Sequence, residues 1–124
     1  RGRGAKPIIY ESPLPQASAY PERFRQFHDD NVALVKSLQV AVAPAVAAWM
    51  KRLGPQPSEK DFQAVYADWI HASPRGAYIT GCCLYAALTG SSPIGLYHPA
   101  DMPAEEAREL QETAWEAFLE TNRP

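Results

Sequence analysis

The hydrophobic residues of the chain first gather in two short runs that have no polar side. Residues 6–11 contain Pro-Ile-Ile-Tyr, and prolines at positions 13 and 15 end this run. Residues 39–43 (Gln-Val-Ala-Val-Ala) are apolar on both faces. Such runs are typical of strands in a parallel sheet that helices cover on both sides. We therefore predict two short buried strands at these positions.

Apolar residues recur at helical spacing in the segments that follow. Between Phe24 and Leu38 they predict a helix with one buried face, opened by a proline at position 21. A second helix is predicted at residues 44–53, and Gly54 stops it. Three more are predicted at 58–65, where Ser58 and Asp61 give a helix-start signal, at 74–89 and from Asp101 to about Phe118. The order strand, helix, strand, helix predicts an α/β fold with short parallel strands and mainly helical content.

The fourth of these helices is apolar nearly all round, so we expect it to lie at the centre of the fold. Ser73 is a suitable N-cap for it and Gly90 a suitable C-terminal glycine. Gly76 and Gly81 predict that another part of the backbone packs closely against this helix. Asp101 is predicted to cap the last helix.

Composition narrows the class of protein. With 124 residues the chain is long enough for a single domain, predicted over residues 1–124. A net charge of −2 gives no reason to expect nucleic acid or an anionic membrane as a partner, and no run is long enough to span a bilayer. The basic residues 1–6 predict a solvated tail, and Cys82 and Cys83 predict small core residues. Because the chain begins with Arg1, we expect a processed product or a piece of something longer; the compartment stays open between secreted, periplasmic and cytoplasmic.

The candidate chemistry lies in the predicted loop at residues 66–73, where Asp68 precedes His71 by three residues. A carboxylate that binds one ring nitrogen of a histidine fixes its tautomer and leaves the other nitrogen free to accept a proton from a nucleophile. The alternative is structural, with Asp68 capping a turn and His71 packing or bonding to the backbone. His28 and Asp29 are expected on a solvated helix face, and His98 in a surface loop. No metal or organic cofactor is expected, because no set of ligands shows suitable spacing.

The residues around this pair resemble a known family. The sequence Asp-x-x-His-Ala-Ser-Pro-x-Gly-Ala-Tyr, followed by Cys-Cys-Leu-Tyr-Ala-Ala-Leu-Thr-Gly and Ser-Pro-Ile-Gly, is similar to the C-terminal block of SGNH (GDSL-type) hydrolases. The resemblance extends from Pro7 to about Phe118 and is most specific over residues 68–95. It implies a partial three-layer, flavodoxin-like fold. It also implies that His71 is the general base of a Ser-His-Asp triad and that Asp68 orients it.

The nucleophile that this resemblance requires is missing from the chain. No Gly-Asp-Ser block is found, and Ser12 is rejected because Pro13 favours an extended conformation rather than a helix start. We therefore expect the C-terminal part of a serine esterase or carbohydrate deacetylase, acting on a small-molecule or glycan ester. An N-terminal half or a partner chain would carry the serine, so this chain alone would be inactive. The alternative is a non-catalytic binding or partner-subunit module, in which Trp69 stacks on a sugar ring.

Overall fold

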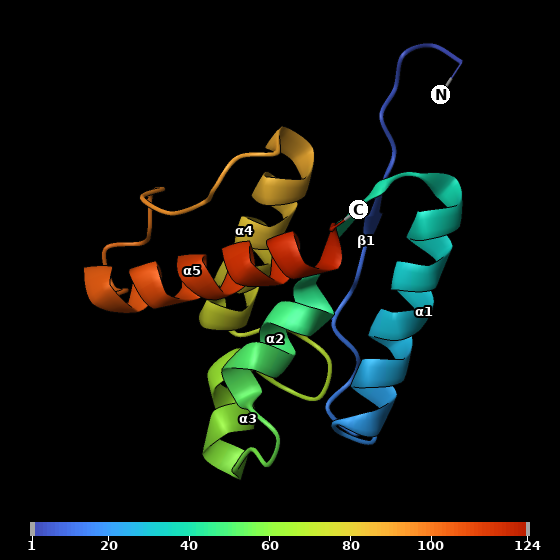
Figure 1. The fold of residues 1–124 in the computed structure, drawn as a ribbon. Coiled ribbons are helices and arrows are strands. Elements are labelled where there is room, and N and C mark those ends of the chain that lie inside the picture. Colours follow the sequence, from blue (N-terminus) through green and yellow to red (C-terminus); the bar gives the residue numbers. More distant parts are fainter. Residues whose placement is uncertain (1, 124) are drawn as a thin grey trace.

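The computed structural model describes residues 2–123 and shows an α/β protein of mainly helical content (Figure 1). Arg1 and Pro124 lie outside the described residues. Both belong to the predicted domain, and Arg1 also belongs to the predicted tail. In chain order the elements are β1 (Ile8–Tyr10), α1 (Glu22–Leu38), β2 (Ala41–Ala43), α2 (Ala45–Leu53), α3 (Glu59–Val65), α4 (Pro74–Thr89) and α5 (Ala104–Thr121).

The two strands pair in parallel, as predicted, but each is only three residues long. The prediction that both strands are buried is wrong for β1, where Ile8 and Ile9 are half-buried and Tyr10 is exposed. Ile9 lies opposite Val42 in the register, with one further pair on either side. In Figure 1 β1 lies between α1 and α4, so helices cover both faces of this small sheet. The coarse α/β prediction is therefore confirmed. The described residues form a sheet of two strands, which does not show the wider flavodoxin-like sheet that was expected.

The hydrophobic core lies where α4 packs against α2 and α5. The side chains of Trp49 on α2, Ile79 on α4 and Leu110 on α5 have no exposed surface. Cys82 and Cys83 are buried in the same core as free thiols, as predicted. Because large side chains from three helices interlock here, the start of α4 and the loop before it have a fixed position.

Close packing against the predicted glycines is found at one of the two positions. A Cβ atom on Gly76 would lie 2.2 Å from the carbonyl oxygen of Val65 and 2.7 Å from Cζ2 of Trp49, so only glycine fits there. The prediction for Gly81 is wrong, because nothing lies within 4 Å of the corresponding position. Gly81 instead lines a surface hollow beside α4.

The helix ends follow the predicted signals in most cases. Ser58 and Asp61 form a reciprocal capping box at the start of α3, and Ser73 accepts a hydrogen bond from the Gly76 N–H at the start of α4. Gly90 has φ 70° after the end of α4, a conformation that glycine adopts without strain. The prediction for Asp101 is wrong. α5 begins after Pro103 with no side-chain cap, because the chain makes a separate turn at residues 100–102.

The expectation that α4 is central holds for one side of the helix only. Ile79, Cys83 and Ala86 are buried, whereas Leu88 is 70% exposed. Within residues 2–123, none of the helices combines the length and apolar character needed to cross a membrane.

Candidate functional site

The loop between α3 and α4 closes on itself and so holds its side chains in place. Tyr66 and Ala72 form an isolated antiparallel bridge, and the Ala67 N–H donates to the carbonyl oxygen of His71 at 2.9 Å. The Ser73 N–H donates to the carbonyl oxygen of Val65 at 2.8 Å. These backbone bonds join the end of α3 to the start of α4, which leaves residues 67–71 as a short tip.

The same loop is tied to the segment that follows β1. The Gln16 N–H donates to the carbonyl oxygen of Trp69 at 2.9 Å, and the Tyr66 hydroxyl donates to the carbonyl oxygen of Leu14. The Tyr66 ring also packs edge-on against Trp49, with 4.9 Å between ring centroids. The loop therefore has a defined position relative to β1 as well as to α2.

At the tip of the loop the structure brings the predicted pair together. Oδ2 of Asp68 lies 2.8 Å from Nδ1 of His71. Oδ1 of the same carboxylate accepts hydrogen bonds from the backbone N–H groups of His71 at 2.7 Å and of Ile70 at 2.8 Å. Asp68 thus does what both interpretations of the sequence required: it caps the turn and it contacts the imidazole.

The hydrogen bonds to Asp68 determine its charge. The backbone N–H groups of His71 and Ile70, with the His71 side chain, lower the pKa of Asp68 to about 2. The carboxylate is therefore ionised at neutral pH and accepts a hydrogen bond from the protonated Nδ1 of His71. In that tautomer Nε2 of the imidazole is a proton acceptor. Both side chains are accessible, with 77% of the His71 side chain and 52% of the Asp68 side chain exposed.

The imidazole lines a surface hollow of about 450 Å³ at the carboxyl end of β1. Its walls come from the end of β1, from the loop and from α4, and include Tyr10, Ser12, Ile70, Thr80 and Leu84. Ligand sites of α/β proteins lie at the carboxyl ends of parallel strands, so the position suits a binding site. Sequence reasoning considered only Ser12 among these wall residues, and rejected it as the nucleophile. The others were not identified, because they are brought together only by the packing of β1 against α4.

Trp69 does not line this hollow. Its side chain is 72% exposed, and Ile70, its neighbour, lies in the wall instead. The predicted role of Trp69 in stacking on a substrate therefore concerns a surface beside the hollow rather than the hollow itself.

Besides the phenol of Tyr10, two aliphatic hydroxyl groups line the hollow and could be considered as the nucleophile, those of Thr80 and Ser12. The Thr80 hydroxyl accepts a hydrogen bond from Nε1 of Trp49 at 3.1 Å. Ser12 is exposed and lies in the irregular segment between β1 and α1, so it does not lead directly into a helix. Among residues 2–123, no hydroxyl group makes a hydrogen bond to the ring of His71. The acid and the base are thus together without a nucleophile joined to them.

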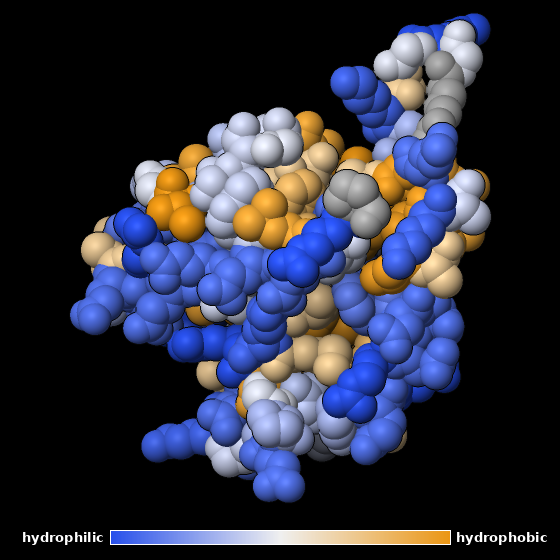
Figure 2. Space-filling model, viewed as in Figure 1, coloured by the Kyte–Doolittle hydropathy of each residue, from blue (hydrophilic) through white to orange (hydrophobic). Residues whose placement is uncertain are grey.

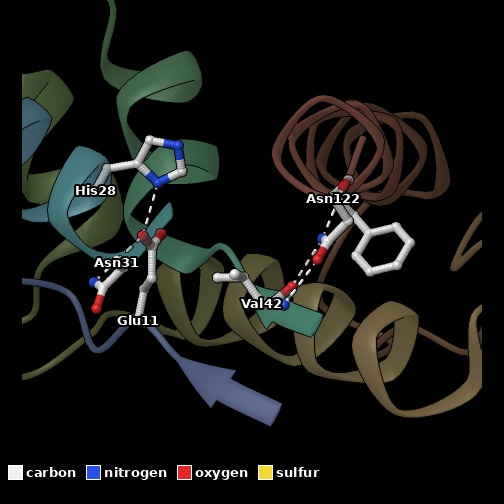
Figure 3. A network of polar contacts seen from close by, with 6 residues as sticks. Glu11, His28, Asn31, Val42 and Asn122 are labelled. Carbon is white, nitrogen blue, oxygen red and sulfur yellow. Dashed lines mark hydrogen bonds and ion pairs between the residues drawn. The ribbon is translucent and has the colours of Figure 1, made fainter. Parts of the chain in front are cut away.

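A second carboxylate–imidazole pair was not predicted. Oε2 of Glu11 lies 2.7 Å from Nδ1 of His28, and Nδ2 of Asn31 lies 3.5 Å from the same oxygen (Figure 3). Glu11 is fully buried and its Oε1 has no partner within the described residues. The expectation that His28 lies on a solvated face is wrong, because α1 lays this residue over the end of β1.

The surroundings of His28 act on its charge in opposite directions. Burial lowers the pKa of His28, but the hydrogen bond and the charge of Glu11, with the charge of Asp29, outweigh burial and raise it above its usual value. Contact with Glu11 therefore favours the protonated form of the His28 imidazole.

No metal site emerges from residues 2–123: nowhere do three His, Cys, Asp or Glu side chains gather closely enough to hold an ion. His98, which the sequence placed in a surface loop, lies in the segment between α4 and α5 and does not line the hollow of His71.

Comparisons with protein-family models, with curated proteins and with solved structures found no match for this chain. The resemblance to SGNH hydrolases therefore remains a prediction from the sequence.

Proposed function

We propose that this chain supplies the histidine and the aspartate of a serine-type ester hydrolase. The observation that carries the proposal is the 2.8 Å contact between Asp68 and His71 in a loop that the backbone holds closed. The substrate would be a small-molecule or glycan ester that occupies the hollow beside the imidazole. A segment outside this chain, either an N-terminal half or a partner chain, would supply the serine.

The two side chains have distinct roles in this chemistry. Nε2 of His71 would take the proton from the serine hydroxyl as its oxygen attacks the ester carbonyl, and would then give that proton to the departing alkoxide. Asp68 would hold the tautomer that leaves Nε2 free and would stabilise the imidazolium formed in between. The low pKa of Asp68, about 2, keeps it ionised throughout.

Exposure of the pair also supports the proposal. Nε2 must reach a group that this chain does not hold, and an imidazole buried in the core could not do so. The exposed His71 side chain at the mouth of a hollow meets this requirement, whereas His28 is mostly buried against Glu11.

The first experiment tests where the nucleophile lies. The chain alone is treated with a fluorophosphonate that labels activated serines, and we expect no labelling and no hydrolysis of p-nitrophenyl acetate. Ser12→Ala serves as the control, because Ser12 is the exposed serine of the hollow. Strong labelling that Ser12→Ala abolishes would place the nucleophile inside this chain and overturn this part of the proposal.

The second experiment tests the base. The chain is isolated from its source with the segments bound to it, and labelling of the serine is compared between the natural chain and His71→Gln. We expect a decrease of about 10²–10⁴-fold, the usual contribution of a general base. His98→Gln, at a histidine that does not line the hollow, is the matched control and should label nearly as well as the natural chain. Equal labelling of His71→Gln and the natural chain would remove His71 from the reaction.

A non-catalytic binding module is the second candidate, and one observation favours it. Trp69 and Ile70 are adjacent and expose 72% and 63% of their surfaces, an arrangement that suits stacking on a sugar ring. This candidate predicts that Trp69→Ala loses glycan affinity while His71→Gln keeps full biological activity. Glycan binding measured by calorimetry on both variants separates it from the hydrolase proposal.

A further inference from the structure

The outer edge of β2 is closed by a side chain. The Val42 N–H donates to Oδ1 of Asn122 at 2.8 Å, and Nδ2 of Asn122 donates to the Val42 carbonyl oxygen at 3.0 Å (Figure 3). The amide of Asn122, just after α5, thus takes the two hydrogen bonds that a further strand would make. The sheet ends on this side.

The outer edge of β1 has no such cap. The Glu11 N–H donates to the Ala43 carbonyl oxygen at 3.1 Å. With the register of the two strands, this bond shows that the backbone N–H and C=O groups of Ile9, and the N–H of Glu11, point towards β2. The N–H and C=O groups of Ile8 and Tyr10 therefore point to the other side. Within residues 2–123 none of these groups has a hydrogen-bond partner, so β1 presents an open edge.

Successive residues of β1 line hollows on opposite faces of the sheet, so a neighbouring strand would find space for its side chains on both faces. Ile8 lines a hollow of about 510 Å³ with Leu88 of α4. Ile9 lines a hollow of about 370 Å³ with Leu38 of α1, on the opposite face. Tyr10 is 46% exposed and lines the hollow of His71, again on the α4 side. Figure 2 shows apolar surface where the N-terminal segment enters the fold, between the ends of α4 and α1.

We propose that the open edge of β1 receives a third strand, parallel to β1, from a polypeptide segment other than this one. Successive side chains of a strand point to opposite faces, so apolar residues of the incoming strand would enter the hollows on the α4 and α1 sides in turn. Its carboxyl end would reach the hollow of His71. The further claim that this segment carries the attacking serine depends on the proposed function. The docking of a strand depends only on the open edge of β1.

Charge and symmetry select this occupant over a second copy of the chain. Among the described residues, Lys6 is the one charged side chain that lines the hollow of Ile8, at the amino end of the edge. An acidic residue at the start of a parallel strand would complement it. Two copies related by a two-fold axis would pair their β1 edges antiparallel. The amino end of one edge would then lie beside the carboxyl end of the other, where the acid Glu11 is fully buried and bonded to His28 and therefore does not reach Lys6 of a second copy.

Hydrogen exchange of backbone amides tests the docking without an activity assay. Four seven-residue peptides are added in excess, each starting with glutamate and alternating valine with threonine, isoleucine, leucine or phenylalanine. We expect at least one to slow exchange of the Ile8 and Tyr10 amides about tenfold or more. The Ile9 amide, which already bonds to β2, is the internal control. The same peptides with a central proline should have a much weaker effect.

Three results would overturn the inference. The first is that, before any peptide is added, the Ile8 and Tyr10 amides are already as protected as the Ile9 amide. Protection could rise with the concentration of the chain itself, together with a dimer in sedimentation, which would make a second copy the occupant. The third result is that no peptide of the four slows exchange of the Ile8 and Tyr10 amides. If a strand docks but the assembled protein does not label with fluorophosphonate, the proposed function fails and the docking inference stands.

Discussion

Two carboxylate–imidazole pairs of nearly equal length have opposite surroundings in this protein. Asp68 and His71 are 2.8 Å apart on an exposed loop and three positions apart in the sequence. Glu11 and His28 are 2.7 Å apart, with a fully buried carboxylate, and 17 positions apart. The same two functional groups are thus held once by local geometry and once by the packing of α1 over β1.

The difference between the pairs lies in what else the carboxylate binds. Asp68 accepts two backbone N–H bonds besides its contact with His71, so the backbone, more than the imidazole, favours its ionised form. Glu11 has the contact with His28, a long one with Asn31 and an oxygen without a partner. A buried charge with so few partners depends on the opposite charge of His28. The exposed pair is suited to proton transfer, and the buried pair to fixing α1 to β1.

The largest expected effect breaks the buried pair. His28→Ala leaves Glu11 in the core without its cation, which costs about 3 kcal/mol of the free energy of unfolding, at the lower end of the range for a broken buried pair. The lower end applies because 19% of the His28 side chain reaches solvent. Urea unfolding of the variant and the natural chain at neutral pH measures the loss. A double variant with Glu11→Leu should recover part of it, and a loss below about 0.5 kcal/mol, the size of an ordinary surface substitution, would contradict the buried-pair interpretation.

The two pairs also differ in how far the sequence predicted them. Asp68 and His71 share one loop, and the Ser73 cap that ends this loop is a local signal that the structure confirms. The predicted contact therefore needed no knowledge of the fold. Whether these residues catalyse a reaction stays a prediction.

Contacts between distant segments could not be predicted in the same way. Glu11 meets His28 only because α1 crosses the end of β1, and no spacing in the sequence records that crossing. One signal was available: Glu11 lies two positions after Ile9 and so on the same face of the predicted strand, from which a buried carboxylate needing a partner could have been inferred. Gly76 and Gly81 teach the same lesson, because only the position of Trp49 distinguishes them.

The second prediction uses pH to sharpen the comparison. The pKa of His28 is raised in the folded protein, so protonation of His28 stabilises the fold fully below the unfolded value of 6.5, and this stabilisation is lost as the pH rises through the folded pKa. The difference in free energy of unfolding between the natural chain and His28→Gln should therefore fall as the pH rises above about 6.5. Urea unfolding at several pH values from 5 to 9 measures it. A difference that grows with pH would show that the imidazole is neutral beside Glu11.

The third prediction concerns the exposed carboxylate, whose contribution to stability is lost as the pH falls rather than as it rises. Asp68 has a pKa of about 2, below its usual 3.8, so its contribution is present above pH 3.8 and is lost as the pH falls towards 2. A carbon-detected NMR titration should give this low value, and Asp68→Asn should speed exchange of the Ile70 and His71 amides. Asp61, which Ser58 holds in a capping box, is a matched control whose pKa is also lowered. An ordinary pKa for Asp68 would mean that the backbone bonds of the loop are not formed in solution.

The smallest expected effect removes the exposed imidazole. His71→Ala should leave the midpoint of thermal unfolding unchanged within error, because the side chain is 77% exposed and Asp68 keeps its two backbone bonds. Differential scanning calorimetry of His71→Ala beside His28→Ala makes the comparison direct, since each variant removes one imidazole from one carboxylate. Similar decreases in both variants would show that His71 supports the fold as His28 does. An unchanged midpoint would mean that any loss of reaction in a His71 variant comes from the chemistry of the imidazole and not from unfolding.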